Sequence, residues 1–480
     1  LDLAERTSFP EVSFHIPPRT ERSVASSTVP PSRESARLMP FLLLSAGTLL
    51  AGVGNGIAIV ALPWLVLERT GSATSAAIVA AAASVPLLFA SLFSGTIVDL
   101  AGRRRVAIFS DALSALSVIA IPLIDAAFGL TVASLAILAA LGAVFDPAGI
   151  TARETMLPEA ARTSGLRLDR VNSIYEAIFN GAYLIGPGVG GLLVATIGAV
   201  NTLWFTGAGF VLSMIAVSGV RLAGAGKPSL ADQATGFWRN TGEGLRFVWR
   251  DHLLRASALL TMGVTAFYLP VEGVILPAYF TKMETPSNLG WVIMTMSAGG
   301  LLGALAYGQW AARLSRRLIF ITALIALGVT VLGLALLPPI AVMLVLSAIM
   351  GVTYGPAGPI TNYAMQTRTP DRLRGRITGV MASSTYAAGP VGYLLAGPLI
   401  DRLGIQLAFL LLASLLTLIA LSSLAIPALR ELDAPSTGED RGQLEWVEEA
   451  ASDLPPVEIG ALYPTMPLNH PGTPPRQPDS

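Results

Sequence analysis

Four carboxylic acids interrupt long apolar stretches of this sequence: Asp111, Asp146, Glu176 and Glu272. An ionised side chain at the centre of a bilayer costs roughly 2.5–3.5 kcal/mol or more, so an acid inside such a stretch is a candidate for proton or cation binding. Asp111 and Asp146 lie close to the ends of their stretches. For these two, pairing with the arginines at 103–105 or at 153 is the favoured structural alternative.

A polar and aromatic stripe follows the third acid. Asn180 stands four residues after Glu176, and Tyr183 continues the same helical face. Lipid would not tolerate this face, so we expect it to line a cavity. Asn55, among the glycines of the first apolar stretch, is a further cavity candidate that either binds a substrate or bridges two helices. Tyr268 and Tyr354 complete the candidate cavity residues.

The fourth acid, Glu272, lies between Pro270 and Pro277. A helix interrupted around an acid suits a gate or a cation site. The equally weighted alternative is an ion pair with Lys282. No histidine lies within an apolar stretch and the chain has no cysteine, which argues against a metal centre, a disulfide or a membrane-embedded enzyme.

The composition places these residues in a membrane. Of the 480 residues, 53% are hydrophobic and 13% are charged, whereas soluble domains carry about 25% charged residues. The formal net charge of zero argues against a nucleic-acid partner.

Twelve apolar segments have the length of about 20 residues that a transmembrane helix needs. They cover 39–66, 74–98, 106–128, 130–151, 171–195, 199–222, 253–281, 288–311, 318–337, 340–364, 377–400 and 405–428. With both chain ends in the cytoplasm, the inner loops hold twenty Lys and Arg residues and the outer loops hold three. This split predicts cytoplasmic termini. No Arg or Lys is expected deep in a span.

Segment composition predicts the domain boundaries. Residues 1–37 and the acidic, Pro-rich stretch 429–480 read as disordered cytoplasmic tails. Two six-helix halves cover 38–222 and 253–428, and residues 223–252 form a cytoplasmic linker. The chain begins with Leu1 rather than methionine, which leaves the true start residue open.

The two halves repeat short motifs in parallel. "FDPAGIT" from Phe145 recurs as "YGPAGPIT" from Tyr354. Gly186-Pro187 recurs as Gly389-Pro390. Parallel repeats of six helices are a transporter architecture, with the substrate site near mid-membrane between the halves.

The loop after the second span carries the pattern Gly95-x-x-x-Asp99-x-x-Gly102-Arg103-Arg104. This pattern resembles the signature loop of the major facilitator superfamily, with Leu100 where the family usually has arginine. Within that superfamily, "ALPWLVLERTGSA", "LPEAARTSGLRLDRVNSIYEA" and "TPDRLRGRITG" are similar to bacterial exporters of the enterobactin-exporter and macrolide-efflux type. The resemblance covers nearly all of 38–428 and implies an all-α fold of twelve transmembrane helices.

The charges of this loop suggest a conformational latch. The arginines can pair with Asp99, with carbonyls at helix ends or with anionic headgroups. We expect the loop to latch the two halves together on the cytoplasmic side, and plain anchoring of the arginines is the alternative. Gly186, Pro187, Gly190 and Gly191 form a helix-bending motif that resembles one associated with exporters. The alternative interpretation of this motif is that its small residues only allow close packing of helices.

These observations predict a proton-coupled exporter of lipophilic or amphipathic small molecules, such as drugs, macrolides or siderophores, and not an enzyme. We expect a monomer in the bacterial inner membrane, in contact with lipid and without a cofactor. An importer of a small metabolite and a lipid translocator remain the alternatives.

Overall fold

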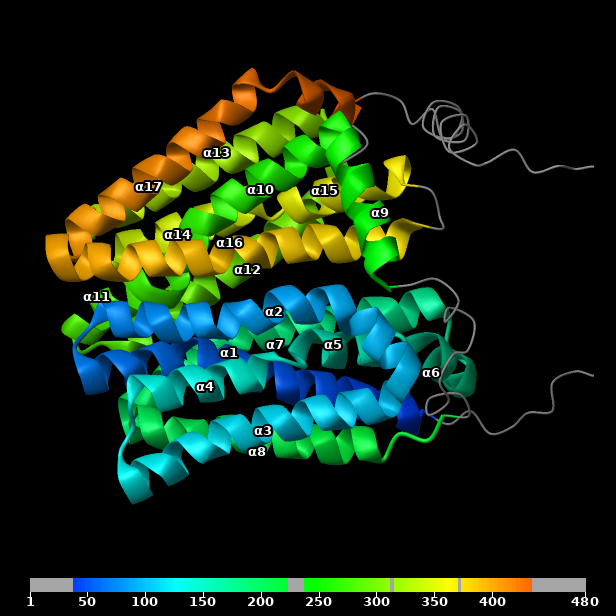
Figure 1. Cartoon of the computed structure of the whole chain (residues 1–480), viewed down its shortest axis with the longest axis horizontal. Coiled ribbons are helices and arrows are strands. Elements are labelled where there is room, and N and C mark those ends of the chain that lie inside the picture. Colours follow the sequence, from blue (N-terminus) through cyan, green and yellow to red (C-terminus); the bar gives the residue numbers. More distant parts are fainter. Residues whose placement is uncertain (1–37, 223–236, 311–314, 370–372, 434–480) are drawn as a thin grey trace, which may run out of the picture.

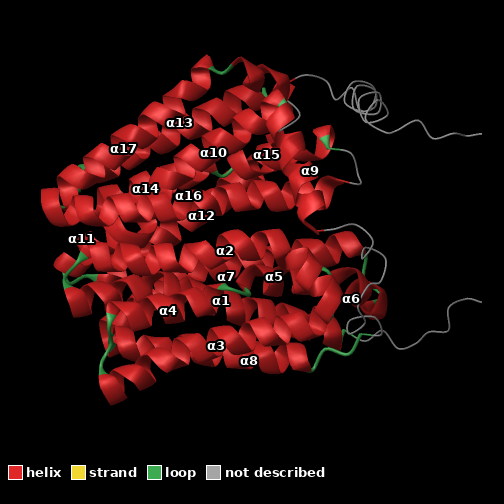
Figure 2. Ribbon diagram, in the orientation of Figure 1, coloured by secondary structure: helices red, strands yellow, loops and turns green. Residues whose placement is uncertain are grey.

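The structure, a computed structural model, describes residues 38–222, 237–310, 315–369 and 373–433, and every regular element in these ranges is a helix (Figures 1 and 2). The predicted tail 1–37 and residues 434–480 of the predicted tail 429–480 lie outside the described residues, whereas residues 429–433 of that tail belong to a 3₁₀ helix. The helices before the linker are α1 (Met39–Thr70), α2 (Ala73–Ala101), α3 (Arg103–Phe128), α4 (Val132–Ala143), α5 (Asp146–Glu154), α6 (Leu157–Ser164), α7 (Leu168–Ile197) and α8 (Ala199–Ser218). After the linker come α9 (Phe237–Arg250), α10 (His252–Pro270), η1 (Val271–Ile275), α11 (Leu276–Lys282), α12 (Pro286–Trp310), α13 (Arg316–Ala335), α14 (Ile340–Tyr354), α15 (Ala357–Arg368), α16 (Arg374–Leu403), α17 (Ile405–Ser422), η3 (Ser423–Ala425) and η4 (Pro427–Asp433).

The long helices run roughly parallel in two groups, α1–α8 and α10–α17, which lie against each other in Figure 1. The two groups pack mainly through α2 against α16 and α7 against α12. We call the end with the α2–α3 turn at Gly102 and the helix α9 the basic end. The end with the α1–α2 turn at Gly71 is the opposite end.

Eleven segments of the described chain are long and apolar enough to cross a membrane. They correspond to every predicted span except 377–400, which forms part of the 30-residue helix α16. This helix is rich in Gly, Ser, Thr and Pro, so its hydropathy is lower than that of its neighbours. It packs on α2 and on α10, where small residues such as Gly397 allow the helices to approach closely.

The repeated Pro-Ala-Gly motif breaks the fourth helix of each half. α4 ends at Ala143 and α5 begins at Asp146, with Pro147 in its first turn. In the second half α14 ends at Tyr354 and α15 begins at Ala357, directly after Pro356. A proline lacks the N–H that a helix interior needs, so it is best placed where a new helix starts.

The seventh span is irregular at its acid. Between α10 and α11 the five residues Val271–Ile275 form a π-helix directly after Pro270. This helix contains Glu272. A π-helical turn of this kind often marks a functional site. The predicted interruption around Glu272 is therefore present as a change of helical pitch rather than a gap.

The linker contains a helix that the sequence analysis did not predict. α9 runs across the basic end, at a steep angle to the long helices (Figure 1), and packs on α16 and α10. Val248 is buried in this contact, whereas Leu245 and Trp249 are exposed. The preceding linker residues 223–236 lie outside the described part of the chain.

Candidate functional site

Asp111 forms a buried ion pair with Arg153. Arg153 lies in α5 and donates to the Asp111 carboxylate of α3, and the two side chains are 5% and 3% exposed. The hydroxyl of Ser213 in α8 lies 2.8 Å from the second carboxylate oxygen of Asp111. Asp111 is thus paired with Arg153, which is the structural alternative that the sequence analysis gave for this acid. The cluster ties three helices of one half together.

Arg153 is buried, although the sequence analysis counted it among the arginines of the inner loop that follows the predicted span 130–151. Arg153 stands seven residues after Asp146, which places both on one face of a continuing helix. That spacing was the signal available in the sequence. Because Arg153 is paired, it does not offer an unopposed positive charge to a substrate.

Asp146 lies between the two halves rather than at a helix end facing solvent. The Asn55 amide of α1 donates to its carboxylate at 3.3 Å, and Tyr183 of α7 lies close to the same Asn55. Tyr386 of α16, in the other half, is close enough to interact electrostatically with both Asp146 and Tyr183. Asn55 therefore bridges two helices, and this polar group lies where the halves meet.

Glu272 forms a second acidic site, in the other half. Its charge acts on the hydroxyls of Tyr268 and Tyr393. Gly273 gives Tyr393 room, because a Cβ built there would lie 3.0 Å from the tyrosine oxygen. Among the described residues, Glu272 forms no ion pair with Lys282. The two residues stand ten positions apart, which is about 15 Å along a helix.

The five candidate cavity residues fall into three groups. Asn55 and Tyr183 belong to the Asp146 group. Tyr268 and Tyr354 pack together with ring centroids 6.3 Å apart, next to Glu272. Asn180 donates to the backbone carbonyl of Glu176 at 2.8 Å and to its carboxylate at 3.3 Å, and both residues are exposed.

The glycine motif of α7 provides two close helix contacts on different faces. A Cβ on Gly186 would lie 2.7 Å from the Cα of Gly56, and a Cβ on Gly190 would lie 2.9 Å from the Cα of Ile57. These contacts join α7 to α1 within one half. A Cβ on Gly191 would meet the Pro286 carbonyl of α12 at 2.7 Å. The predicted small-residue packing is thus present, both within a half and between the halves.

One carboxylate joins the two halves by hydrogen bonds at the opposite end. Asp401, near the end of α16, accepts hydrogen bonds at 2.9 Å from the Ser72 hydroxyl and from the backbone N–H groups of Ala73 and Thr74. It acts as an additional cap for the first turn of α2. Gly397, one turn earlier, lets α16 approach Thr74 and Ala77. The sequence analysis did not identify Asp401.

Contacts between the halves continue toward the basic end, where Leu92 of α2 packs against a cluster that includes Ile377 and Val380 of α16. Ser91 of α2 and Ser383 of α16 share a buried hydrogen bond of 2.7 Å. Beyond it, Gly95 and Gly308 have open space where a Cβ would lie, and so does Gly181 of α7. The described hydrogen bonds between the halves are thus more numerous at the opposite end, and α7 has open space where a Cβ on Gly181 would lie.

The arginines of the signature loop bind carbonyls within their own half. Arg103 donates to the carbonyl of Thr155 at 3.0 Å, and Arg104 donates to the carbonyl of Ser218. This is one of the three pairings considered from the sequence. The side chain of Asp99 lies outside the described part of the chain, so the latch between the halves stays a prediction.

Comparisons with known proteins agree with this architecture. The family model described as Major Facilitator Superfamily matches residues 44–280 and 272–463. "Multidrug efflux pump Tap" of Mycolicibacterium fortuitum is 52% identical over 400 residues, which are 83% of this chain and 98% of that protein. Tap of Mycobacterium tuberculosis (strain ATCC 25618 / H37Rv) is 49% identical over 413 residues, 85% of this chain and 98% of the relative. "Macrolide efflux protein A" of Streptococcus pyogenes is 23% identical over 82% of this chain and 98% of its own length.

Solved structures share the fold at low sequence identity. The nucleoside transporter NupG (D323A mutant) has a TM-score of 0.70 at 10% identity, covering 81% of this chain and 100% of the other. The D-xylose-proton symporter has a TM-score of 0.64 at 13% identity, covering 81% and 98%. The helices form two repeated groups, the family model matches most of the chain, and solved transporters share the architecture. The chain is therefore a multi-pass membrane protein of the major facilitator superfamily.

Proposed function

We propose that this protein exports lipophilic or amphipathic drugs from the cell in exchange for protons, as a monomer that alternates between two open states. The observation that carries the proposal is the identity of about half of all residues with multidrug efflux pumps, over 98% of their length. The predicted inner loops hold twenty Lys and Arg residues, and the described loop with Arg103 and Arg104 lies at the basic end, so this end faces the cytoplasm in our proposal.

The junction between the halves suits an apolar substrate. Tyr183, Tyr268, Tyr354 and Tyr386 contribute aromatic surface from four helices. The buried guanidinium of Arg153 is already neutralised by Asp111. Aromatic walls with few charges favour ligands that gain from leaving water. A polyanion or a sugar would instead need unpaired cations or a dense set of hydrogen-bonding groups.

The arrangement of contacts supports a state open to the cytoplasm. The halves touch at Asp401 and at Gly191 near the opposite end, and the α7 surface at Gly181 is uncovered. A substrate would enter from the basic end in this state. Export then requires the contacts of the opposite end to break while new contacts form at the basic end.

Glu272 is the carrier that we propose for the proton. It lies in a π-helix near the junction, and no hydrogen bond to it is present among the described residues. Asp111 is occupied by Arg153, and Glu176 is exposed on α7. Asp146 is the second choice, since the single amide of Asn55 binds it. An acid without a fixed cationic partner can gain and lose a proton at lower structural cost.

Accumulation of a fluorescent lipophilic cation in bacterial cells that lack their main efflux pumps tests this proposal. The wild-type protein should lower accumulation, an uncoupler should restore it, and Glu272→Gln should abolish the effect. Glu284→Gln, the same chemical change at an exposed glutamate, is the matched control and should export normally. Export by Glu272→Gln equal to wild type would move the carrier to Asp146. Export that an uncoupler leaves unchanged would contradict proton coupling.

A further inference from the structure

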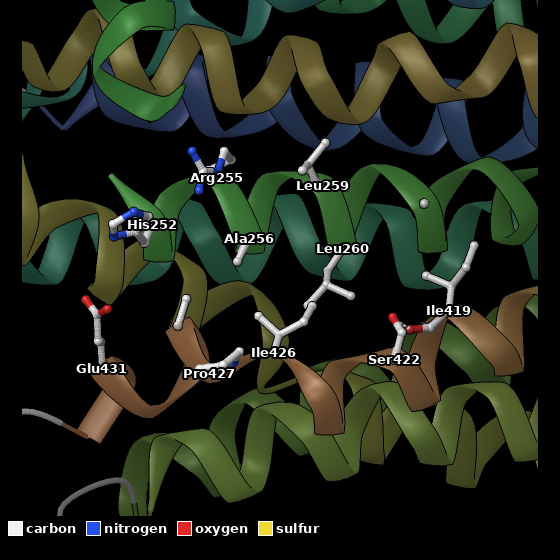
Figure 3. A pocket seen from close by; sticks show the side chains of 12 residues that line it. His252, Arg255, Ala256, Leu259, Leu260, Ile419, Ser422, Ile426, Pro427 and Glu431 are labelled. Atoms are coloured by element: carbon white, nitrogen blue, oxygen red, sulfur yellow. Dashed lines mark hydrogen bonds between the residues drawn. The ribbon is translucent and has the colours of Figure 1, made fainter. Parts of the chain in front are cut away.

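A cavity of about 760 Å³ lies between α10 and the end of α17, and all of its lining residues belong to the second half (Figure 3). It exists because α17 stops at Ser422 and the chain continues in two short 3₁₀ helices, η3 and η4. Ile426, between them, is in an extended conformation that turns the chain. The end of α17 therefore leaves a notch beside α10 instead of packing along it.

The lining of the cavity changes from charged to apolar along α10. His252, Arg255 and Glu431 lie at one end in Figure 3. Leu259, Leu260, Ile419 and Ile426 form the aliphatic part. Leu259 remains 44% exposed, so this apolar surface is not covered by protein.

Arg255 and His252 are the groups at the mouth that can bind an anion. Arg368 of α15 binds Glu431 at 2.8 Å and also Asp251 at 3.3 Å, so the two acids of this corner share one arginine. Asp251 also caps the start of α10 by accepting from the Leu254 N–H at 2.8 Å. Arg255 uses one nitrogen for the Trp249 carbonyl at 2.9 Å, and its remaining N–H groups and the imidazole of His252 stand at the first turn of α10.

The depth of the cavity matches one leaflet of a bilayer. From His252 to Gly263 the lining residues span eleven positions of α10, which is about 16 Å at 1.5 Å per residue. Half of a hydrocarbon core of about 30 Å is about 15 Å. The charged end thus lies at headgroup level, and the aliphatic part lies at the level of the acyl chains.

We propose that this cavity binds an anionic phospholipid from the leaflet at the basic end. Arg255 and His252 bind the headgroup phosphate, and one acyl chain lies along Leu259, Leu260 and Ile419. Such a lipid would hold α10 to η4, on the outer side of the half that carries Glu272. This proposal goes beyond drug export. It rests on the membrane position of the basic end and not on the direction of transport.

Lipid binding to the purified full-length chain tests the proposal without any transport assay. Native mass spectrometry in equimolar phosphatidylglycerol and phosphatidylcholine should show one phosphatidylglycerol bound in clear preference. Arg255→Ala should reduce this preference about fivefold, because one basic residue near a membrane surface contributes about that factor. Arg255→Lys keeps the positive charge and should retain most of the preference for phosphatidylglycerol. Ala256→Phe, which fills the aliphatic part, should remove the bound lipid of either kind.

Arg221→Ala is the matched control, since Arg221 is an exposed arginine at the basic end of the other half. It should bind lipid as the wild type does. Equal binding of the two lipids by the wild-type protein would overturn the assignment of an anionic headgroup. Undiminished binding by both Arg255→Ala and Ala256→Phe would overturn the site. Displacement of the lipid by a transported drug at the same residues would make the cavity a drug site instead.

Discussion

Asp401 offers the sharpest test of how the two halves are held together. Its carboxylate accepts three hydrogen bonds of 2.9 Å from the first residues of α2, and all three cross from one half to the other. Asp401→Ala removes them and leaves Ser72 as the remaining cap of α2. The opposite end should then open more often.

The magnitude follows from the role of Asp401 as a cap. Loss of a capping side chain costs about 1 kcal/mol, within a range of about 0.5–2 kcal/mol. Asp401 is exposed, so we take the middle value rather than the upper one. About 1 kcal/mol changes the ratio of closed to open molecules roughly fivefold. Asp401→Asn keeps an acceptor oxygen and should have a smaller effect.

The absence of cysteine in the sequence makes a clean assay possible. Ser84 of α2 is 7% exposed and faces Gly389 of α16, so Ser84→Cys places one nearly isosteric thiol between the halves. A membrane-impermeant maleimide, added from the opposite end, should label this thiol about five times faster when Asp401→Ala is also present.

Asp125→Ala is the control for this experiment. Asp125 binds Arg69 at 2.5 Å at the same end of the molecule, and both residues belong to the first half. Its removal should leave the labelling rate unchanged. An unchanged rate in Asp401→Ala would refute the view that this carboxylate holds the opposite end closed.

Three further predictions concern packing and charge. Arg153→Met should strand the Asp111 carboxylate and destabilise the protein by about 3–5 kcal/mol, and Asp111→Asn combined with Arg153→Met should recover much of this loss in thermal unfolding. Gly191→Leu should block transport while the halves still fold, because its side chain would meet the Pro286 carbonyl; Gly181→Ala, at a glycine with open space around it, is the control in the same assay of cation accumulation in cells. Ser383→Ala should shift the labelling of Ser84→Cys less than Asp401→Ala does, since Ser91 keeps a hydrogen bond to the Leu88 carbonyl; an equal or larger shift would place the main closure at the serine pair.

Hydropathy predicted the spans because each one must be apolar over the thickness of a bilayer. α16 shows the limit of that signal, since part of its surface packs on α2 and α10 and its Gly, Ser, Thr and Pro residues lower its hydropathy. The repeated Pro-Ala-Gly motif was recognised as a repeat, but its consequence was not predicted. Pro147 and Pro356 start new helices, and each divides a span in two.

The candidate acids could be found from the sequence, but their partners could not. Asp111 and Arg153 are 42 residues apart, and Asp401 binds residues more than 300 positions away. Local patterns carry no information about such distances. Asp401 stands at the end of a span, where an acid is unremarkable, so only the packing of α16 against α2 reveals its role.

Proton release coupled to drug movement tests the central claim most directly. The protein would be placed in liposomes with a pH-sensitive dye inside, and a lipophilic cation would be added without any imposed gradient. The account predicts a drug-dependent change of internal pH that Glu272→Gln abolishes and Glu284→Gln retains. Drug movement without any change of internal pH would contradict a proton-coupled exporter.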